Sequence, residues 1–288
     1  MNVLTLIEQS AAQLEAAGVS YGHGTTNAFD EAAWLVMWRL GLPLDDLDSV
    51  ENQPVAQEQI AQVATLLEAR ILTRKPAAYL TQEAWLQGMP FYVDERAIVP
   101  RSFIAELLMD GGIDYWLHTH THAVLDLCTG NGSLAVLAAM VYPDVQVTAA
   151  DISTDALAVA RINVDKHSLQ TRITLVESDG LAQVPGVFDL ILCNPPYVNS
   201  QSMAALPAEY QAEPVLALAG GTDGMDFIRS LLKAASAKMA PDGVLVLEIG
   251  NEREYFEAAF PALEVVWLET SAGEDQVLLV TREALDAL

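Results

Sequence analysis

The sequence is poor in positive charge. Its 288 residues contain 14 Lys and Arg against 39 Asp and Glu, which gives a formal net charge of −25 at pH 7. The first 69 residues contain one basic residue, Arg39, and ten acidic ones. Because the few cations are scattered, we expect no direct binding to nucleic acid, which requires a local basic groove. The acidic surface suits a basic protein partner, although the same charge would also serve solubility alone.

Cysteines and long apolar runs are scarce as well. The two cysteines, Cys128 and Cys193, favour a reduced, cytoplasmic protein over one held together by disulfides. The longest apolar run, residues 134 to 142, is far shorter than the ~18 residues of a membrane span, so we expect no membrane association. No Lys or Arg precedes Arg39, so we expect no secretory signal.

The length is more than one average domain needs, and a hydrophobic fraction of 52% supplies enough apolar residues for packed cores. Apolar residues recur at helical spacing near the beginning of the chain and again in residues 27 to 40 and 55 to 73. We predict a small all-helical domain at residues 1–75. A linker with a β-hairpin around Gly88 follows at 76–104, and a larger domain occupies 105–288.

The larger domain alternates between strand and helix signals. We predict five strands, at residues 123–128, 145–151, 173–177, 188–193 and 243–249, with helices at 133–141, 154–167 and 226–239. Two final strands, at 265–269 and 276–281, are joined by a short loop that forces them to be antiparallel. The pattern predicts an α/β protein with a seven-stranded, mostly parallel, Rossmann-like sheet covered on both faces.

A glycine-containing loop separates the first of these strands from its helix. It reads Asp126-Leu127-Cys128-Thr129-Gly130-Asn131-Gly132. Glycines allow a tight turn and close approach of a ligand, and the helix beyond offers free N–H groups. Asp151, followed by Ile152, ends the next strand, where a carboxylate can hold ribose hydroxyls. Asp179-Gly180 ends the third strand, where Asp179 can accept a hydrogen bond from an adenine amino group, although a plain turn fits equally well.

The glycine loop is compatible with more than one ligand. Gly130 and Gly132 with Ala135 also match the dinucleotide fingerprint. Asp126, however, places a negative charge just ahead of the loop, which suits the positive end of a methionine moiety better than a pyrophosphate. The loop therefore favours S-adenosylmethionine over NAD, with a ligand-free turn as the remaining alternative.

The segment Asn194-Pro195-Pro196-Tyr197 directly follows the fourth strand. Two consecutive prolines remove N–H donors, stiffen the chain and leave carbonyls as unpaired acceptors. The side-chain carbonyl of Asn194 adds an acceptor, and Tyr197 offers a flat stacking face. Two fixed acceptors can hold the protons of a weakly nucleophilic NH₂ group and aim its lone pair at a sulfonium methyl. The segment thus predicts methyl transfer to an amino or amide nitrogen.

Other chemistry-bearing residues fit simpler interpretations. The cysteines fall at strand ends beside the expected site, where small buried residues are commoner than catalytic thiols. His118, His120 and His122 alternate as metal ligands could, but a solvated loop before the first strand explains them as well. We expect no metal ion.

With these motifs in hand, the chain resembles the protein-glutamine methyltransferases of the HemK/PrmB family, over residues 76 to 285. The similarity is greatest to the branch that acts on large-subunit ribosomal protein three. Cys128 matches this branch but departs from the Gly that the release-factor branch and the general methyltransferase loop usually carry, and Asn131 departs mildly from a usual Ser or Thr. The matching segments are 79–81, 83–85, 91–96, Val99-Pro100-Arg101-Ser102, 126–132, Asp151 and Asn194-Pro195-Pro196-Tyr197.

The resemblance implies a class I methyltransferase that methylates a glutamine side chain, with the helical domain recognising a basic ribosomal protein, free or in a ribosome assembly intermediate. Three alternatives stay open: release-factor glutamine, an adenine amino group on nucleic acid, and a non-catalytic ribosome-assembly factor. We expect catalysis by Asn194, Pro195, Pro196 and Tyr197, and substrate contacts from Arg101, Asn194, Pro195 and Tyr197. We expect S-adenosylmethionine to contact Asp126, Cys128, Thr129, Gly130, Asn131, Gly132, Asp151, Ile152, Asp179, Gly180 and Asn194.

Overall fold

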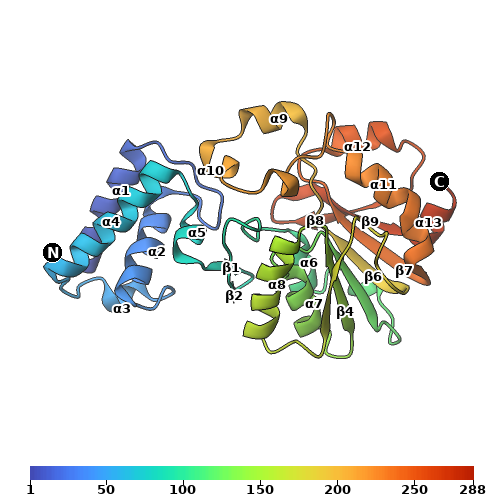
Figure 1. Ribbon diagram of the computed structural model, residues 1–288, viewed down its shortest axis with the longest axis horizontal. Coiled ribbons are helices and arrows are strands. Elements are labelled where there is room, and N and C mark those ends of the chain that lie inside the picture. Colours follow the sequence, from blue (N-terminus) through green and yellow to red (C-terminus); the bar gives the residue numbers. More distant parts are fainter.

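The computed structural model describes all residues, 1–288, as a small helical lobe beside a larger α/β lobe (Figure 1). The helices are α1 (Val3–Ala16), α2 (Ala28–Leu40), α3 (Leu47–Val50), α4 (Gln57–Thr73), α5 (Ala77–Thr81), α6 (Ile104–Met109), α7 (Ser133–Val141), α8 (Thr154–Lys166), α9 (Ser200–Ala205), α10 (Ala208–Gln211), α11 (Asp226–Ala235), α12 (Arg253–Ala259) and α13 (Arg282–Asp286). None of these helices combines the length and the hydrophobicity that a membrane-spanning helix needs.

Helices α1 to α4 form the helical bundle. Asn2 and Asn27 cap the N-termini of α1 and α2 by accepting hydrogen bonds from the third residue beyond each cap. Gly41 ends α2 in the left-handed conformation that glycine tolerates best. The apolar faces of α1, α2 and α4 meet in a core of their own, which includes Ile7 and Leu35.

The strands are β1 (Ala84–Leu86), β2 (Met89–Phe91), β3 (Ala123–Leu127), β4 (Gln146–Asp151), β5 (Ile173–Glu177), β6 (Phe188–Cys193), β7 (Met239–Glu248), β8 (Val266–Thr270) and β9 (Gly273–Thr281). β1 and β2 form a separate antiparallel hairpin. The other seven form one sheet in the order β5-β4-β3-β6-β7-β9-β8. β5, β4, β3, β6 and β7 are parallel, whereas β9 pairs antiparallel with β7 and β8.

This architecture confirms the predicted fold class: a mostly parallel seven-stranded sheet with a C-terminal antiparallel hairpin and helices at the N-terminal end. Alternate strand residues enter two different cores. Leu190 and Leu192 of β6 face a core with α6 and α7, whereas Ile191 and Cys193 face a core with α11 and Phe256 of α12. The strand order reverses at β3 and β6, where ligands bind in open α/β sheets.

Several boundaries differ from the prediction. β7 begins at Met239, because a bulge lets the Pro-Asp-Gly turn signal lie within a strand that pairs with β6. α11 ends at Ala235 and continues only as a short 3₁₀ turn. The last hairpin turn is tighter than expected, because Gly273 takes a positive φ of 119° and already pairs with Thr270.

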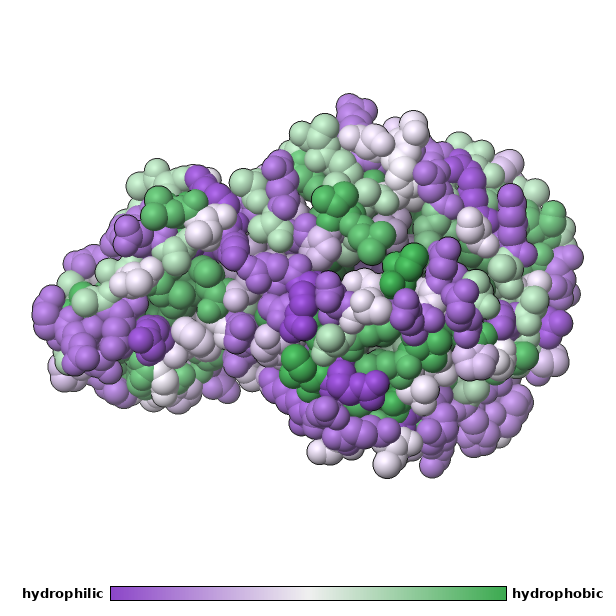
Figure 2. All heavy atoms as spheres, viewed as in Figure 1, coloured by the Kyte–Doolittle hydropathy of each residue, from purple (hydrophilic) through white to green (hydrophobic).

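Figure 2 shows hydrophobic atoms gathered around a hollow in the visible face of the larger lobe, while hydrophilic atoms dominate its outer rim.

Residues 198–220, which follow β6 and include α9 and α10, reach from the sheet toward the helical bundle (Figure 1). We call them the insert.

Candidate active site

The loop after β3 is held at the carboxyl edge of the sheet by Asp151. The amide N–H of Gly130 donates to the Asp151 carboxylate at 2.9 Å, and that of Ser153 donates to its other oxygen at 2.9 Å. Gly132 has φ +82° and is the N-cap residue of α7, and a Cβ at this position would lie 3.0 Å from Ala160. A Cβ at Gly130 would meet no atom within 4 Å, so its backbone faces open space. The loop thus leaves room for a ligand where the helix begins.

Asp126 lies beneath this loop. Its side chain is buried and accepts hydrogen bonds from the Thr129 hydroxyl and, at 2.9 Å, from the Ala135 amide. Burial raises the pKa of Asp126 to about 7. Its hydrogen bonds go to the loop and to α7, so Asp126 stabilises the turn without lining the cavity.

Asn131 and Gly132 also lie behind the loop surface. Asn131 accepts a hydrogen bond from the Ser133 amide through its side chain, and its backbone carbonyl accepts one from Asn163 of α8. These bonds tie the loop to both helices that follow it. Cys128 lies at the front of the loop with φ +60°, a conformation that favours glycine. A hydrogen bond to Cys193, together with burial, raises the pKa of the Cys128 thiol, so it stays protonated.

The segment after β6 presents a row of free acceptors. No N–H or O–H group of the protein donates to the backbone carbonyl of Asn194, Pro195 or Pro196. The Asn194 side chain makes no hydrogen bond to the protein either, although it is half-buried. Tyr197 follows, and its hydroxyl lies 3.4 Å from a carboxylate oxygen of Glu248 on β7. The acceptors predicted from the two prolines are therefore present and unpaired.

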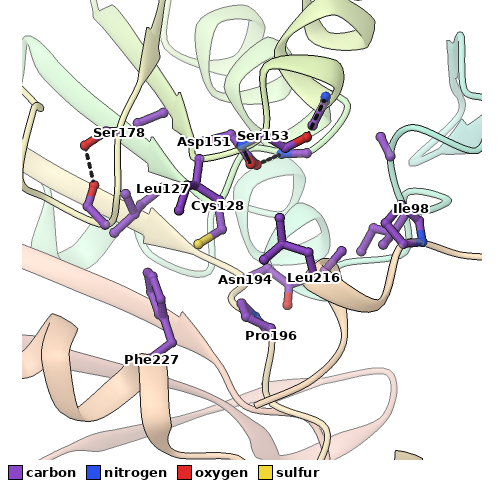
Figure 3. A pocket seen from close by; sticks show the side chains of 18 of the residues that line it. Ile98, Leu127, Cys128, Asp151, Ser153, Ser178, Asn194, Pro196, Leu216 and Phe227 are labelled. Atoms are coloured by element: carbon purple, nitrogen blue, oxygen red, sulfur yellow. Dashed lines mark hydrogen bonds between the residues drawn. The ribbon is translucent and has the colours of Figure 1, made fainter. Parts of the chain in front are cut away.

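A cavity of about 210 Å³ joins the two loops (Figure 3). Asp151 and Ser153 lie on one side of it, Asn194 and Pro196 on the other, and Cys128 between them (Figure 3). From the predicted set, the residues that line it are Cys128, Gly130, Asp151, Ile152, Asp179, Gly180, Asn194 and Pro196. Those that do not line it are Asp126, Thr129, Asn131, Gly132, Pro195, Tyr197 and Arg101.

Sequence reasoning missed three parts of the cavity wall. Phe227 at the start of α11 supplies an aromatic face, and Leu216 with its neighbours in the insert closes a second side. Residues 96–98 form a third side. The sequence marks residues 91–96 only through the family resemblance. An apolar stretch such as 214–217 gives no signal for a site until the fold places it over the sheet edge.

Arg101 lies outside the cavity and binds the insert. Its guanidinium makes two hydrogen bonds of 2.7 Å to the two oxygens of Glu213. Glu213 also accepts a bond from the Val99 amide and lies 3.3 Å from the buried His23. Although burial opposes ionisation, the proximity of His23 and Arg101 lowers the pKa of Glu213 to about 2. Arg101 is thus paired with Glu213 and fixes the position of the insert against the linker.

Glu248 makes a second connection behind the cavity. It accepts hydrogen bonds from the Ser102 hydroxyl at 2.6 Å and the Phe103 amide at 2.9 Å, in addition to its contact with Tyr197. Burial raises the pKa of this carboxyl to about 7. The segment 99–103 is therefore joined to the insert through Glu213 and to Tyr197 through Glu248.

The residues considered for metal binding lie apart from this site. His118 and His120 stack on one another in the turn before β3, with ring centres 5.2 Å apart. His122 lies near the backbone carbonyl of Asp144. No group of three or more His, Cys, Asp and Glu side chains has an arrangement that could hold a metal ion.

Comparisons with known proteins show which family the chain belongs to. The model of the methyltransferase small domain matches residues 110–211, and that of the PrmC N-terminal domain matches residues 5–81. In overall fold the chain is similar to the hMettl16 catalytic domain in complex with a MAT2A 3'UTR hairpin, at a TM-score of 0.51 and 13% identity, over 77% of this chain and 80% of that one.

Curated relatives extend the similarity to nearly the full length. The chain is 52% identical to the ribosomal protein uL3 glutamine methyltransferase of Bordetella pertussis, over 98% of this chain and 95% of that protein. It is 49% identical to the Burkholderia pseudomallei enzyme of that name, over 99% and 96%. The Bradyrhizobium diazoefficiens enzyme is 43% identical, over 99% and 92%. The chain therefore belongs to the family of the ribosomal protein uL3 glutamine methyltransferases.

Proposed function

We propose that the protein transfers a methyl group from S-adenosylmethionine to the side-chain amide nitrogen of a glutamine in ribosomal protein uL3. The observation that carries this proposal is the set of unpaired acceptors in Asn194-Pro195-Pro196, at the edge of a cavity behind a glycine loop. The relatives that match over nearly the whole chain bear the name of this activity. Binding alone would not need paired acceptors facing an NH₂ group.

The cavity residues fit S-adenosylmethionine. Asp151 lies at the cavity wall with its carboxylate beside the Gly130 amide, which suits the two hydroxyls of a ribose. Burial raises its pKa, so a ligand that donates hydrogen bonds to the carboxylate favours the ionised form. Phe227 and Asp179 offer an aromatic face and an acceptor for an adenine. Asp126, Thr129, Asn131 and Gly132 would act by shaping the loop.

The chemistry required of the protein is to make an amide nitrogen nucleophilic. When bound, S-adenosylmethionine supplies an electrophilic methyl group on a sulfonium. The Asn194 side-chain carbonyl and the Pro195 carbonyl accept one N–H each from the glutamine amide. This holds the nitrogen in place, turns its lone pair toward the methyl group and stabilises the positive charge that develops on nitrogen. Tyr197, fixed by Glu248, packs against the amide plane.

The state of the substrate and the location follow from the same proposal. A glutamine must reach the Asn194 carbonyl, so we place the reaction on free uL3 or on an assembly intermediate that exposes it. We propose a cytoplasmic location, because a uL3 substrate is met where ribosomes are assembled and a reducing compartment suits the two free thiols, Cys128 and Cys193. The protein's charge of −25 argues against nucleic acid as the methylated partner.

The test offers competing substrates to the same enzyme. Methyl-labelled S-adenosylmethionine is incubated with purified uL3, assembled large subunits, a peptide chain release factor and ribosomal RNA in separate reactions. We expect label on one glutamine of uL3, located by mass spectrometry. Label on the release factor or on adenine instead would transfer the proposal to those substrates. Cofactor binding without label on any of the four would favour a non-catalytic assembly factor.

A further inference from the structure

A second cavity lies between the helical bundle and the β1–β2 hairpin, away from the cofactor cavity. Its volume is about 490 Å³. It is lined by the loop before α2, by α2 itself, by the segment after α2 and by β1, and no Lys or Arg lines it. Two tryptophans, Trp34 and Trp85, and two aspartates, Asp30 and Asp45, are among its lining residues. The reaction proposed above makes no use of these four side chains.

The two tryptophans provide flat faces at different depths. Trp34 is half-buried and packs on the cluster that contains Tyr79 and Val99. Its indole N–H is shielded and has no acceptor in the protein. Trp85 is 46% exposed, yet its indole N–H donates to Glu83 at 2.9 Å, which holds the ring in one orientation. A large aromatic ring held at the surface beside a cavity is typical of binding sites.

The charges around these rings are negative. Asp30 and Asp45 are both exposed, and residues 1–69 contain ten acidic residues and Arg39 as the one basic residue. A cation entering the cavity would meet carboxylates and tryptophan faces together. Among side chains the guanidinium of arginine fits best, because its plane stacks on an indole while its N–H groups reach carboxylates.

We propose that this cavity binds an arginine side chain of the substrate protein and serves as an anchor remote from the reacting glutamine. The identity of the partner rests on the proposed function, since ribosomal proteins are basic. Trp34 packs in the same cluster as Val99, whose amide binds Glu213 of the insert. The proposed anchor therefore packs against Val99, the residue that also binds the insert, and the insert forms one wall of the cofactor cavity. Binding energy gained there orients the substrate at Asn194.

The first test compares two substitutions that remove the same charge. Asp45→Asn changes the cavity, and Asp48→Asn changes an exposed residue of α3 outside it. We expect Asp45→Asn and Trp85→Leu each to raise KM for uL3 about 5- to 20-fold, with kcat and the affinity for S-adenosylmethionine unchanged. Asp48→Asn should stay within about two-fold. Equal effects of the two Asp substitutions would overturn the proposal, because global charge would then explain both.

The second test measures ligand binding to the cavity without methyl transfer, so its result does not depend on the proposed function. Tryptophan fluorescence is titrated with N-acetyl-arginine methylamide and with the uncharged citrulline analogue. We expect saturable quenching by the arginine compound alone, which Trp85→Leu abolishes and Asp45→Asn weakens. Equal response to both compounds would refute a cation site. Arginine binding with an unchanged KM for uL3 in Asp45→Asn would refute the role in substrate binding.

Discussion

Two buried carboxylates hold the segments around the cavity beside Asn194 without a cationic partner. Asp126 accepts hydrogen bonds from Thr129 of the loop after β3 and from Ala135 of α7. Glu248 accepts hydrogen bonds from the Ser102 hydroxyl and the Phe103 amide and contacts Tyr197. Neither carboxylate forms an ion pair, which is an unfavourable arrangement for a buried ionised acid. Such acids concentrate near functional sites, where they fix the positions of neighbouring groups.

Glu248 leads to a prediction for the pH dependence of stability. Burial raises its pKa from 4.5 to about 7, so between these values the folded protein holds a proton that the unfolded chain has lost. The free energy of unfolding should therefore fall as pH rises from 4.5 to about 7, by at most about 3 kcal/mol from this group. Urea unfolding of Glu248→Gln at both ends of the range should show a smaller fall.

The matched control is Glu58→Gln, the same change at an exposed position of α4. It should retain the pH dependence of the wild-type protein. An identical slope in Glu248→Gln and wild type would show that Glu248 is not the group responsible.

Cys128 illustrates why a single residue can be hard to interpret from sequence. It replaces the usual glycine of the general methyltransferase loop, and its φ is +60°, where glycine is the least strained residue. The pattern therefore records a backbone conformation, which this chain reaches with a cysteine that contacts Cys193 at the end of the neighbouring strand.

At the scale of elements, the insert is the part that sequence reasoning could not place. Parallel strands and their helices follow from hydrophobic periodicity, and the antiparallel last hairpin follows from its short loop. The carboxyl ends of β3, β4 and β6 then bring Gly130, Asp151 and Asn194 to one edge. The helices α9 and α10 are short and lack a periodic apolar face, so their positions are set by long-range ion pairs that no local pattern encodes.

The insert is attached through two glutamates. Glu209 accepts hydrogen bonds from Arg70, Arg74 and the Ser20 amide of the helical bundle. Glu213 accepts two hydrogen bonds from the guanidinium of Arg101. We predict that Glu213→Gln lowers the free energy of unfolding by about 2–4 kcal/mol, because it removes one partner of a buried pair. It should also raise KM for S-adenosylmethionine, since Pro214, Leu216 and Ala217 line the cavity proposed to bind it.

The comparison for Glu213→Gln is Glu257→Gln, which breaks an exposed pair with Arg253. That change should alter the free energy of unfolding by less than about 1 kcal/mol. Denaturant titrations of both variants provide the measurement. A Glu213 variant as stable as the Glu257 variant would mean that the insert is held mainly by other contacts.

At the scale of the whole molecule, charge is the dominant feature. A net charge of −25 surrounds a site proposed to act on a basic protein. We predict that kcat/KM for uL3 falls severalfold as salt rises from about 0.05 M to 0.5 M, because screening shortens the range of the attraction. Affinity for S-adenosylmethionine should change much less. A kcat/KM that is independent of salt would leave the charge with a role in solubility alone.

The central claim is that free acceptors on Asn194-Pro195-Pro196 activate an amide nitrogen, and the turnover of Asn194→Ala with uL3 tests it most directly. We predict that kcat falls roughly 10²–10³-fold, as for loss of a preorganised hydrogen-bonding group, while the affinity for S-adenosylmethionine stays within a few-fold. Asn194→Asp keeps an acceptor and should retain more activity than Ala, and Asn52→Ala at an exposed position should behave as wild type. Wild-type turnover in Asn194→Ala would contradict the account.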